Sequence, residues 1–307
     1  MQRVIISGSL AYDRIMNFSD TFSNHILPDK IHNLNVCFQV DGVTENFGGT
    51  AGNIAYALRL LGDNPLISAT IGRDHHSYFD WFQQHSIITD GIVIVEKELT
   101  AGAYITTDQS NNQITGFNPG AMKYSSELDV ESLSPEKDLL LISPGNLDDM
   151  IHYPKRCQET GLSYIFDPGQ SLPMLQAGDL QNVISGCLLL IVNDYEFNMI
   201  QEKTGLTDKQ ILALPQTCII TLGDQGSDLY LGDTPTRIPA CKASRVIDPT
   251  GAGDAYRAGL ISGLLRGEDL AVSAKRGSAV ASFAVECAGT QVYSFTLQEF
   301  EERLSTI

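Results

Sequence analysis

The chain has 307 residues, 43% hydrophobic and 19% charged, so it can bury a sizeable core and falls outside the disordered and collagen-like classes. Its 20 Lys and Arg against 37 Asp and Glu give a net charge of −17, which argues against binding nucleic acid or an anionic membrane because the attraction to phosphate is reversed in sign. Its apolar runs are too short for a spanning helix or a secretory signal, so we expect a cytoplasmic protein.

Short continuous apolar runs recur along the chain and predict strands that are buried on both faces, as in a parallel sheet. They lie at 4–6, 66–71, 139–142, 162–166, 188–192 and 218–222. Segments with helical periodicity lie between them, and Gly62 follows one such segment at the position of a C-terminal cap. This alternation predicts an α/β fold with a doubly wound, mostly parallel sheet flanked by helices.

Two stretches, 13–46 and 99–118, interrupt this alternation. Both contain alternating runs, such as residues 35–40, which are typical of strands with one buried face. We predict that they form a small antiparallel β-sheet lid inserted into an α/β core of residues 1–12, 47–98 and 119–307. The edges of an exposed sheet must be covered, which favours a homodimer through the lid.

The cysteines and histidines predict no site of their own. The six cysteines include no C-x-x-C pair, and the six histidines include no H-E-x-x-H pattern. We therefore predict neither a disulfide framework nor a transition-metal site.

The segment from Val246 to Leu260 carries the strongest chemical signal. An extended piece is followed by the turn 251–253 and by a helix of small residues. The backbone amides of this turn would converge at a helix N-terminus and form an anion hole. Asp254 follows directly, so amides that stabilise a transferring phosphoryl group would lie beside a carboxylate that accepts a hydroxyl proton. The same residues also fit a plain tight turn followed by an ordinary first-turn aspartate.

Two nucleotide-binding motifs fit this segment poorly. It is no Walker P-loop, because no Gly-Lys-Ser/Thr follows. Gly251 and Gly253 leave a nicotinamide-dependent oxidoreductase as a distant alternative, disfavoured because Tyr256 stands where the third glycine of that fingerprint belongs.

The sequence from Asp248 to Asp254, DPTGAGD, resembles the C-terminal signature of the ribokinase-like (phosphofructokinase-B) carbohydrate kinases. The sequence from Gly48 to Asn53, GGTAGN, resembles their N-terminal glycine motif. Three more matches follow the family's order: GSLAYD at 8–13, NDYE at 193–196 and TLGDQG at 221–226. The resemblance covers nearly the whole chain and implies a ribokinase-like fold and a kinase that uses ATP and Mg²⁺.

The resemblance also implies roles for individual residues. The general base would be Asp254, and the anion hole would be Gly251, Ala252 and Gly253. The sugar hydroxyls would be held by Asp13, Gly48, Gly49 and Asn53, consistent with a carboxylate and an amide carbonyl accepting from vicinal hydroxyls. ATP would be bound by Asn193, Thr221, Gly223 and Gly226, and Mg²⁺ would be ordered through water by Asn193 and Glu196. A candidate K⁺ site would comprise Asp248, Thr250 and carbonyls near Ala284, Cys287 and Gly289.

Three further segments, 108–115, 166–173 and 254–259, resemble the nucleoside-kinase branch of the family. They imply phosphorylation of the 5′-hydroxyl of a ribonucleoside, with adenosine or another purine nucleoside favoured. Phe117, Phe47 and Tyr104 of the predicted lid could stack against the base or form a small core of their own, and Gln170 could read a base edge or help to order the metal.

Other acceptors and functions stay open at this point. A free sugar such as ribose, fructose or a keto-deoxy sugar acid is the main alternative, and the strong negative charge favours a neutral acceptor over a phosphorylated sugar. A non-catalytic nucleoside sensor is disfavoured, because a protein that only binds needs no base at position 254.

Overall fold

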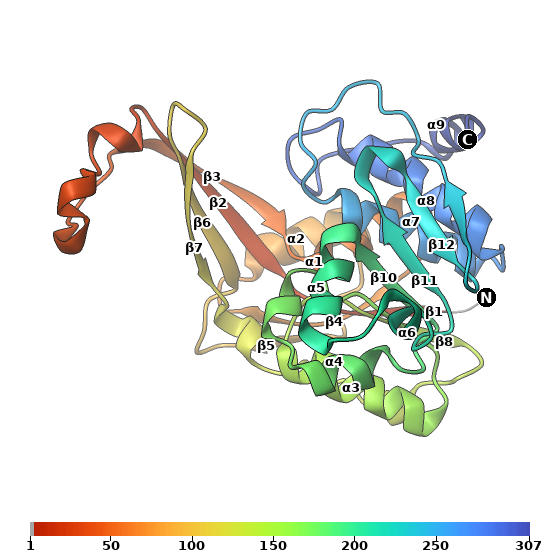
Figure 1. The fold of residues 1–307 in the computed structure, drawn as a ribbon. Coiled ribbons are helices and arrows are strands. Elements are labelled where there is room, and N and C mark those ends of the chain that lie inside the picture. Colours follow the sequence, from red (N-terminus) through yellow and green to blue (C-terminus); the bar gives the residue numbers. More distant parts are fainter. Residues whose placement is uncertain (1–2) are drawn as a thin grey trace.

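The central element of the computed structural model, which describes residues 3–307, is a nine-stranded sheet with the order β13-β12-β11-β10-β9-β8-β1-β4-β5 (Figure 1). Neighbouring strands from β11 through β5 are parallel, and β12 and β13 extend the sheet antiparallel. The strands are β1 (Arg3–Ser7), β4 (Leu66–Gly72), β5 (Ile92–Val95), β8 (Asp138–Ile142), β9 (Tyr164–Phe166), β10 (Leu189–Asn193), β11 (Cys218–Thr221), β12 (Ser227–Tyr230) and β13 (Pro235–Ile238). Every apolar run predicted as a buried strand overlaps one of them.

Helices cover both faces of this sheet, because successive side chains of a strand point to opposite sides. On β1, Val4 and Ile6 belong to one apolar core, and Ile5 belongs to the other. The first core includes side chains of α1 (Thr50–Leu60), α2 (His76–Gln84), α7 (Ala252–Leu265), α8 (Leu270–Ala284) and α9 (Leu297–Leu304). The second includes side chains of α3 (Leu147–Thr160), α4 (Ala177–Ile184), α5 (Asp194–Thr204) and α6 (Asp208–Leu212). The predicted doubly wound α/β architecture is confirmed.

The helices also bear on membrane insertion. Among residues 3–307, none combines the length and the apolarity that crossing a lipid bilayer requires.

A second, four-stranded sheet projects from this body, with the order β3-β2-β6-β7 (Figure 1, left). Its strands are β2 (Ala11–Phe18), β3 (Val40–Gly48), β6 (Ala101–Thr107) and β7 (Gln113–Asn118). The prediction of a purely antiparallel sheet is wrong, because β2 and β6 are parallel and pair from Ala11 opposite Ala101 to Asn17 opposite Thr107. Both strands begin at the end of the small sheet that is nearer the body, with Ala11 and Ala101 paired. Alternating apolar residues report which face is buried but carry no information on strand direction.

The outer end of this sheet also differs from expectation. Residues 35–39, predicted as part of an alternating strand, lie outside β3, which begins at Val40. Short 3₁₀ helices span Phe22–Asn24 and Pro28–Asn33, and Phe38 packs instead against the rings of Phe18 and Phe22.

The predicted core and lid boundaries stay a prediction. The strands of the small sheet lie within two residues of the limits 13–46 and 99–118. Its outer strands β3 and β7 expose Val43 and Ile114, and dimerisation through this sheet also stays a prediction.

Candidate active site

A cavity of about 460 Å³ lies between the C-terminal ends of the central strands and the small sheet. Ligands of open α/β sheets bind at this edge, where loops after the strands meet helix N-termini. Of the predicted site residues, those that line the cavity are Asp13, Gly49, Asn53, Phe117, Gln170, Thr250, Gly251 and Asp254. The fold therefore brings together residues from five separate parts of the sequence.

The predicted anion hole lies at the N-terminus of α7. Gly251 adopts φ +79°, a left-handed conformation that favours glycine, and the helix begins at Ala252 with no side-chain cap. The amide of Ala252 donates to the carbonyl of Pro249 at 3.2 Å, closing a turn. Within the described residues, the amides of Gly251 and Gly253 donate to no acceptor. Two of the three predicted amides thus stay available to an anion, at a helix end whose dipole favours negative charge.

Asp254, in the first turn of α7, places a carboxylate in the cavity. Its Oδ2 accepts a hydrogen bond from Asn53 Nδ2 at 2.8 Å. Burial raises the pKa of Asp254 to about 6, while the charge of Arg257 and the Asn53 hydrogen bond act in the opposite direction. Asp254 is therefore ionised at neutral pH and holds a proton more strongly than an exposed aspartate, which suits a general base.

Asn53 lines the cavity, and its carbonyl already accepts one hydrogen bond from within the protein. Its Oδ1 accepts from Gln291 Nε2 at 3.0 Å, and its Nδ2 donates to Asp254. Buried polar atoms pair with one another when partners are within reach, and Gln291 lies directly behind Asn53. Asn53 can still offer a ligand the second Nδ2 proton and the second lone pair of Oδ1.

The two glycines before α1 allow other parts of the protein to approach the backbone closely. Gly49 adopts φ +88°, and a Cβ there would lie 2.5 Å from the Ser9 carbonyl oxygen. Gly48 does not line the cavity, and a Cβ there would lie 2.7 Å from Asp13 Oδ2. Gly48 therefore makes room for Asp13, whose carboxyl lines the cavity and whose pKa is raised by burial.

An ion pair beside the anion hole was missed from the sequence. Arg257 Nη2 donates to Asp167 Oδ1 at 2.6 Å, and Arg257 Nε lies 2.5 Å from Asp167 Oδ2. Burial lowers the pKa of Arg257, but the carboxylates of Asp167 and Asp254 outweigh this and raise it. A Cβ on Gly253 would lie 2.6 Å from Arg257 Nη1, so this glycine leaves space for the guanidinium. One signal was present: a lone arginine in a helix turn of small and apolar residues.

The residues predicted to order Mg²⁺ form a capping box at the start of α5. Asn193 Oδ1 accepts from the amide of Glu196 at 2.7 Å, and Glu196 Oε2 accepts from the amide of Asn193 at 2.8 Å. Burial raises the pKa of Glu196, and the charge of Asp167 adds to this effect. Glu196 Oε1 accepts no hydrogen bond from the described residues. Oxygen donors in a partly buried, electronegative setting fit a hydrated magnesium ion.

The remaining predicted ATP residues lie at the neighbouring strand end. Asn193 pairs with Thr221 in the parallel β10–β11 ladder, so these two residues are adjacent. Gly223 and Gly226 adopt φ +58° and +89° in the turn that leads into β12. This turn thus joins two antiparallel strands and also flanks the site of Asn193.

The candidate K⁺ residues come together from two loops. Asp248 Oδ1 accepts from the amide of Thr250 at 2.9 Å, and its Oδ2 accepts from the amide of Gly289 at 3.1 Å. The carbonyl of Ala284 accepts from the amide of Cys287 at 3.3 Å. The loops are therefore adjacent, and the cation site stays a prediction.

The aromatic residues of the small sheet divide into two groups. Phe117 lines the cavity and is 56% exposed, so its ring is available to a ligand. The prediction that Phe47 and Tyr104 would also face the base is wrong. Phe47 stacks on Trp81 at 5.2 Å between ring centroids, and Tyr104 accepts a hydrogen bond from Arg14 Nη1 at 3.1 Å. Neither lines the cavity, because each ring is packed against its own neighbours.

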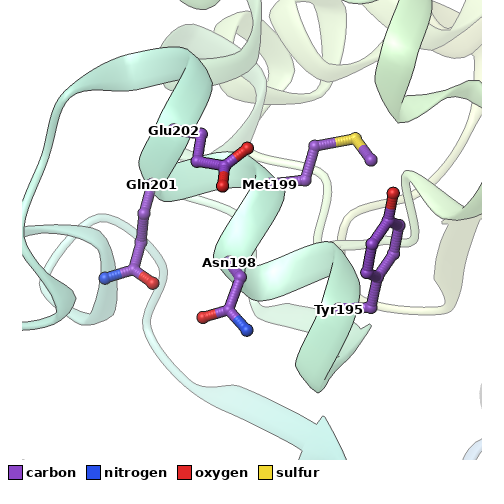
Figure 2. A pocket seen from close by; sticks show the side chains of 5 residues that line it. All are labelled: Tyr195, Asn198, Met199, Gln201 and Glu202. Carbon is purple, nitrogen blue, oxygen red and sulfur yellow. The ribbon is translucent and has the colours of Figure 1, made fainter.

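A second hollow, of about 430 Å³, lies on the outer surface of α5 (Figure 2). Its walls are Tyr195, Asn198, Met199, Gln201 and Glu202. No predicted site residue contributes to it, whereas eight of them line the first cavity.

Known proteins resemble the chain over almost its whole length. The model of the pfkB family of carbohydrate kinases matches residues 12–296. A nucleoside kinase of Methanocaldococcus jannaschii is 32% identical over 306 residues, covering 99% of this chain and 97% of that protein. The structure of Burkholderia thailandensis nucleoside kinase in complex with inosine has a TM-score of 0.87 and 35% identity, with 99% and 98% of the two chains covered. Its complex with ADP-inosine has a TM-score of 0.84 and 38% identity, with 99% and 95% covered.

Proposed function

Because the chain belongs to the pfkB family of carbohydrate kinases, we propose that it transfers the terminal phosphoryl group of ATP to the 5′-hydroxyl of a ribonucleoside, with adenosine or another purine nucleoside as acceptor. The family resemblance read from the sequence is confirmed, and the chain is an ATP-dependent kinase. An oxidoreductase is thereby set aside. The nucleoside acceptor is supported by relatives of 32–38% identity that are nucleoside kinases.

The observation that carries the proposal is the position of Asp254 in the cavity, beside the unpaired amides of the α7 N-terminus. An acceptor hydroxyl at this point would give its proton to the Asp254 carboxylate as its oxygen attacks the phosphoryl group. The amides of Gly251 and Gly253 would stabilise the charge on the transferring oxygens. Holding both reactants in line supplies most of the remaining rate in phosphoryl transfer.

The nucleotide would lie on the α5 side of α7. Asn193, Thr221, Gly223 and Gly226 would contact ATP, and Asn193 and Glu196 would hold Mg²⁺ through water. When bound, the metal would neutralise charge on the phosphates. Loop carbonyls together with Asp248 would hold K⁺.

The walls of the cavity favour a nucleoside over a free sugar. One part is polar and carries Asp13, Asn53, Asp254 and Gln170. Another part is apolar and carries Ala103, Phe117, Met122 and Met174. A ribose would use the polar part, and a flat base would cover the apolar part, which a free sugar would leave exposed to water. The small sheet that supplies Ala103 and Phe117 would act as a lid.

A panel of acceptors tests this function. We expect ADP release to be fastest with purine ribonucleosides and much slower with ribose, fructose or a keto-deoxy sugar acid, because only nucleosides fill both parts of the cavity. The coupled assay should include 5′-deoxyadenosine, which fits the cavity but lacks the reacting hydroxyl. Turnover with free sugars alone would contradict the nucleoside acceptor, and turnover with 5′-deoxyadenosine would contradict 5′-phosphorylation.

The pH dependence of the reaction should report the base. The base works only when deprotonated, so we expect kcat/KM to be constant above the Asp254 pKa of about 6 and to fall as the pH drops through it. The fall should approach about tenfold per pH unit once the carboxyl is mostly protonated. A pH–rate profile at a saturating ATP concentration measures this acidic limb, the part of the profile where the rate falls with decreasing pH. A rate that stays constant down to pH 4.5 would contradict the assignment.

A further inference from the structure

A chain of hydrogen-bonded side chains leads from α2 to the carboxylate of Asp254. Trp81 Nε1 donates to Gln291 Oε1 at 3.0 Å. Gln291 Nε2 donates to Asn53 Oδ1 at 3.0 Å and to Tyr78 Oη at 2.9 Å. Asn53 Nδ2 then donates to Asp254 Oδ2 at 2.8 Å. Gln291 is only 2% exposed and does not line the cavity, so no ligand can reach it.

Hydrogen-bonding chemistry fixes the direction of this chain. An indole N–H can only donate, so the oxygen of the Gln291 amide must face Trp81 and its nitrogen must face Asn53. Asn53 must then present its oxygen to Gln291 and its nitrogen to Asp254. Tyr78 agrees with this direction, since its hydroxyl accepts from Gln291 and donates to the Gly48 carbonyl at 2.7 Å. Turning either amide over would bring like atoms together in a buried place.

The direction matters because it distinguishes the two oxygens of Asp254. Oδ2 receives the Asn53 N–H, whereas Oδ1 accepts no hydrogen bond from the described residues. We propose that Gln291 is a positioning residue for the transfer reaction: it holds the Asn53 amide with its nitrogen toward Asp254, which keeps the base ionised and leaves Oδ1 to take the substrate proton. This inference rests on the proposed function, because it concerns the proposed base.

The charged and titratable groups around Asp254 set the background for this effect. Arg257, on the same helix, lowers the pKa of Asp254, and Asp167, after β9, raises it. Asp13 of β2 lines the same cavity. Tyr78 of α2 and Tyr293 are neutral, because burial raises the pKa of each far above its ordinary value. Of these groups, only Tyr78 is hydrogen-bonded to Gln291 within the described residues, so a change at 291 leaves these groups in place and alters the orientation of the Asn53 amide.

The substitution Gln291→Glu tests the orientation. Glutamate keeps the acceptor for Trp81 but has no N–H for Asn53, so Asn53 should turn its nitrogen to the new carboxylate and its oxygen to Asp254. Two facing oxygens favour the protonated form of Asp254. We expect the acidic limb of kcat/KM to move up by about one pH unit, which is an approximately tenfold lower rate on the acidic side, with a smaller loss on the alkaline plateau because the Asn53 N–H is also turned away from the ligand.

A double-variant cycle separates orientation from the charge that glutamate adds. Asn53→Ala should also move the limb upward, and adding Gln291→Glu to Asn53→Ala should move it no further. A Gln291→Glu shift of the same size without Asn53 would overturn the proposal, and so would a rate loss that is equal at every pH. If Gln291→Glu does not fold, the uncharged Gln291→Met should give a smaller shift in the same direction, and an unchanged limb would overturn the proposal.

Two further measurements identify other causes of failure. Gln158→Glu is a matched control, because Gln158 Nε2 also donates to a tyrosine hydroxyl, that of Tyr164, but at α3, away from the cavity. It should leave the limb in place. Trp81 is the chain's single tryptophan, so its fluorescence reports whether each variant is folded around Gln291. Full turnover by Asp254→Asn would refute the proposed base itself, whereas an inactive Asp254→Asn with an unmoved Gln291→Glu limb would refute only this inference.

Discussion

Asp254→Asn should lower kcat by about 10²- to 10⁴-fold, the usual contribution of a positioned general base. Asparagine has the same shape, and its Oδ1 can still accept the Asn53 N–H that Asp254 accepts at 2.8 Å. It cannot take a proton from the acceptor hydroxyl. We therefore expect binding of nucleoside and ATP to be retained, so that the loss appears in kcat and not in KM. Single-turnover kinetics with calorimetric binding measurements test this.

A control for the helix end is Asp179→Asn. Asp179 also lies in the first turn of a helix, α4, where a carboxylate interacts with the helix dipole, but it is not in the cavity. Any stability lost with a first-turn carboxylate should appear in both variants, and a loss of turnover only in Asp254→Asn. If Asp254→Asn kept kcat within tenfold of the natural chain, Asp254 would not be the base.

The sequence predicts those parts of the site whose residues lie close together in the chain. Each buried strand was visible as an apolar run, and polar residues after the runs predicted which edge would carry the ligand. Asp254 could be placed because the turn at 251–253 and the helix after it are adjacent in the chain. Asn53, at the start of α1, was placed at the site by the resemblance of the sequence 48–53 to the family's glycine motif.

What could not be predicted depends on contacts between distant residues. Gln291 reaches Asn53 across 238 positions, and Arg257 reaches Asp167 across 90. A single sequence contains no periodicity that connects such positions. The Asn53 carbonyl takes part in one of these contacts, and the space left by Gly253 is used by the other. The parallel pairing of β2 with β6 also joins distant segments, because the chain enters the small sheet twice from the same side.

Arg257→Met should destabilise the protein by about 3–5 kcal/mol, the usual result of removing one partner from a buried ion pair. The Asp167 side chain is 1% exposed and that of Arg257 is 11% exposed. Without the guanidinium, Asp167 would keep the Ser143 hydroxyl, at 3.2 Å, as its remaining side-chain partner. Since proteins unfold at a cost of only about 5–15 kcal/mol, urea denaturation should show a large drop in midpoint.

The matched control for this prediction is Arg237→Met, which breaks a bidentate pair of similar geometry with Asp228 on the surface. There Nε lies 2.6 Å from Oδ1 and Nη2 lies 3.1 Å from Oδ2, but the arginine side chain is 53% exposed. The Asp228 side chain that remains is 16% exposed, against 1% for Asp167, so water reaches it more easily and the loss should be smaller, about 1 kcal/mol. Adding Asp167→Asn to Arg257→Met should recover part of the stability, because the unpaired buried charge is removed with its partner. Equal losses for Arg257→Met and Arg237→Met would mean that solvent reaches Asp167, and the charge of Arg257 would then have little influence on the base that lies three residues before it.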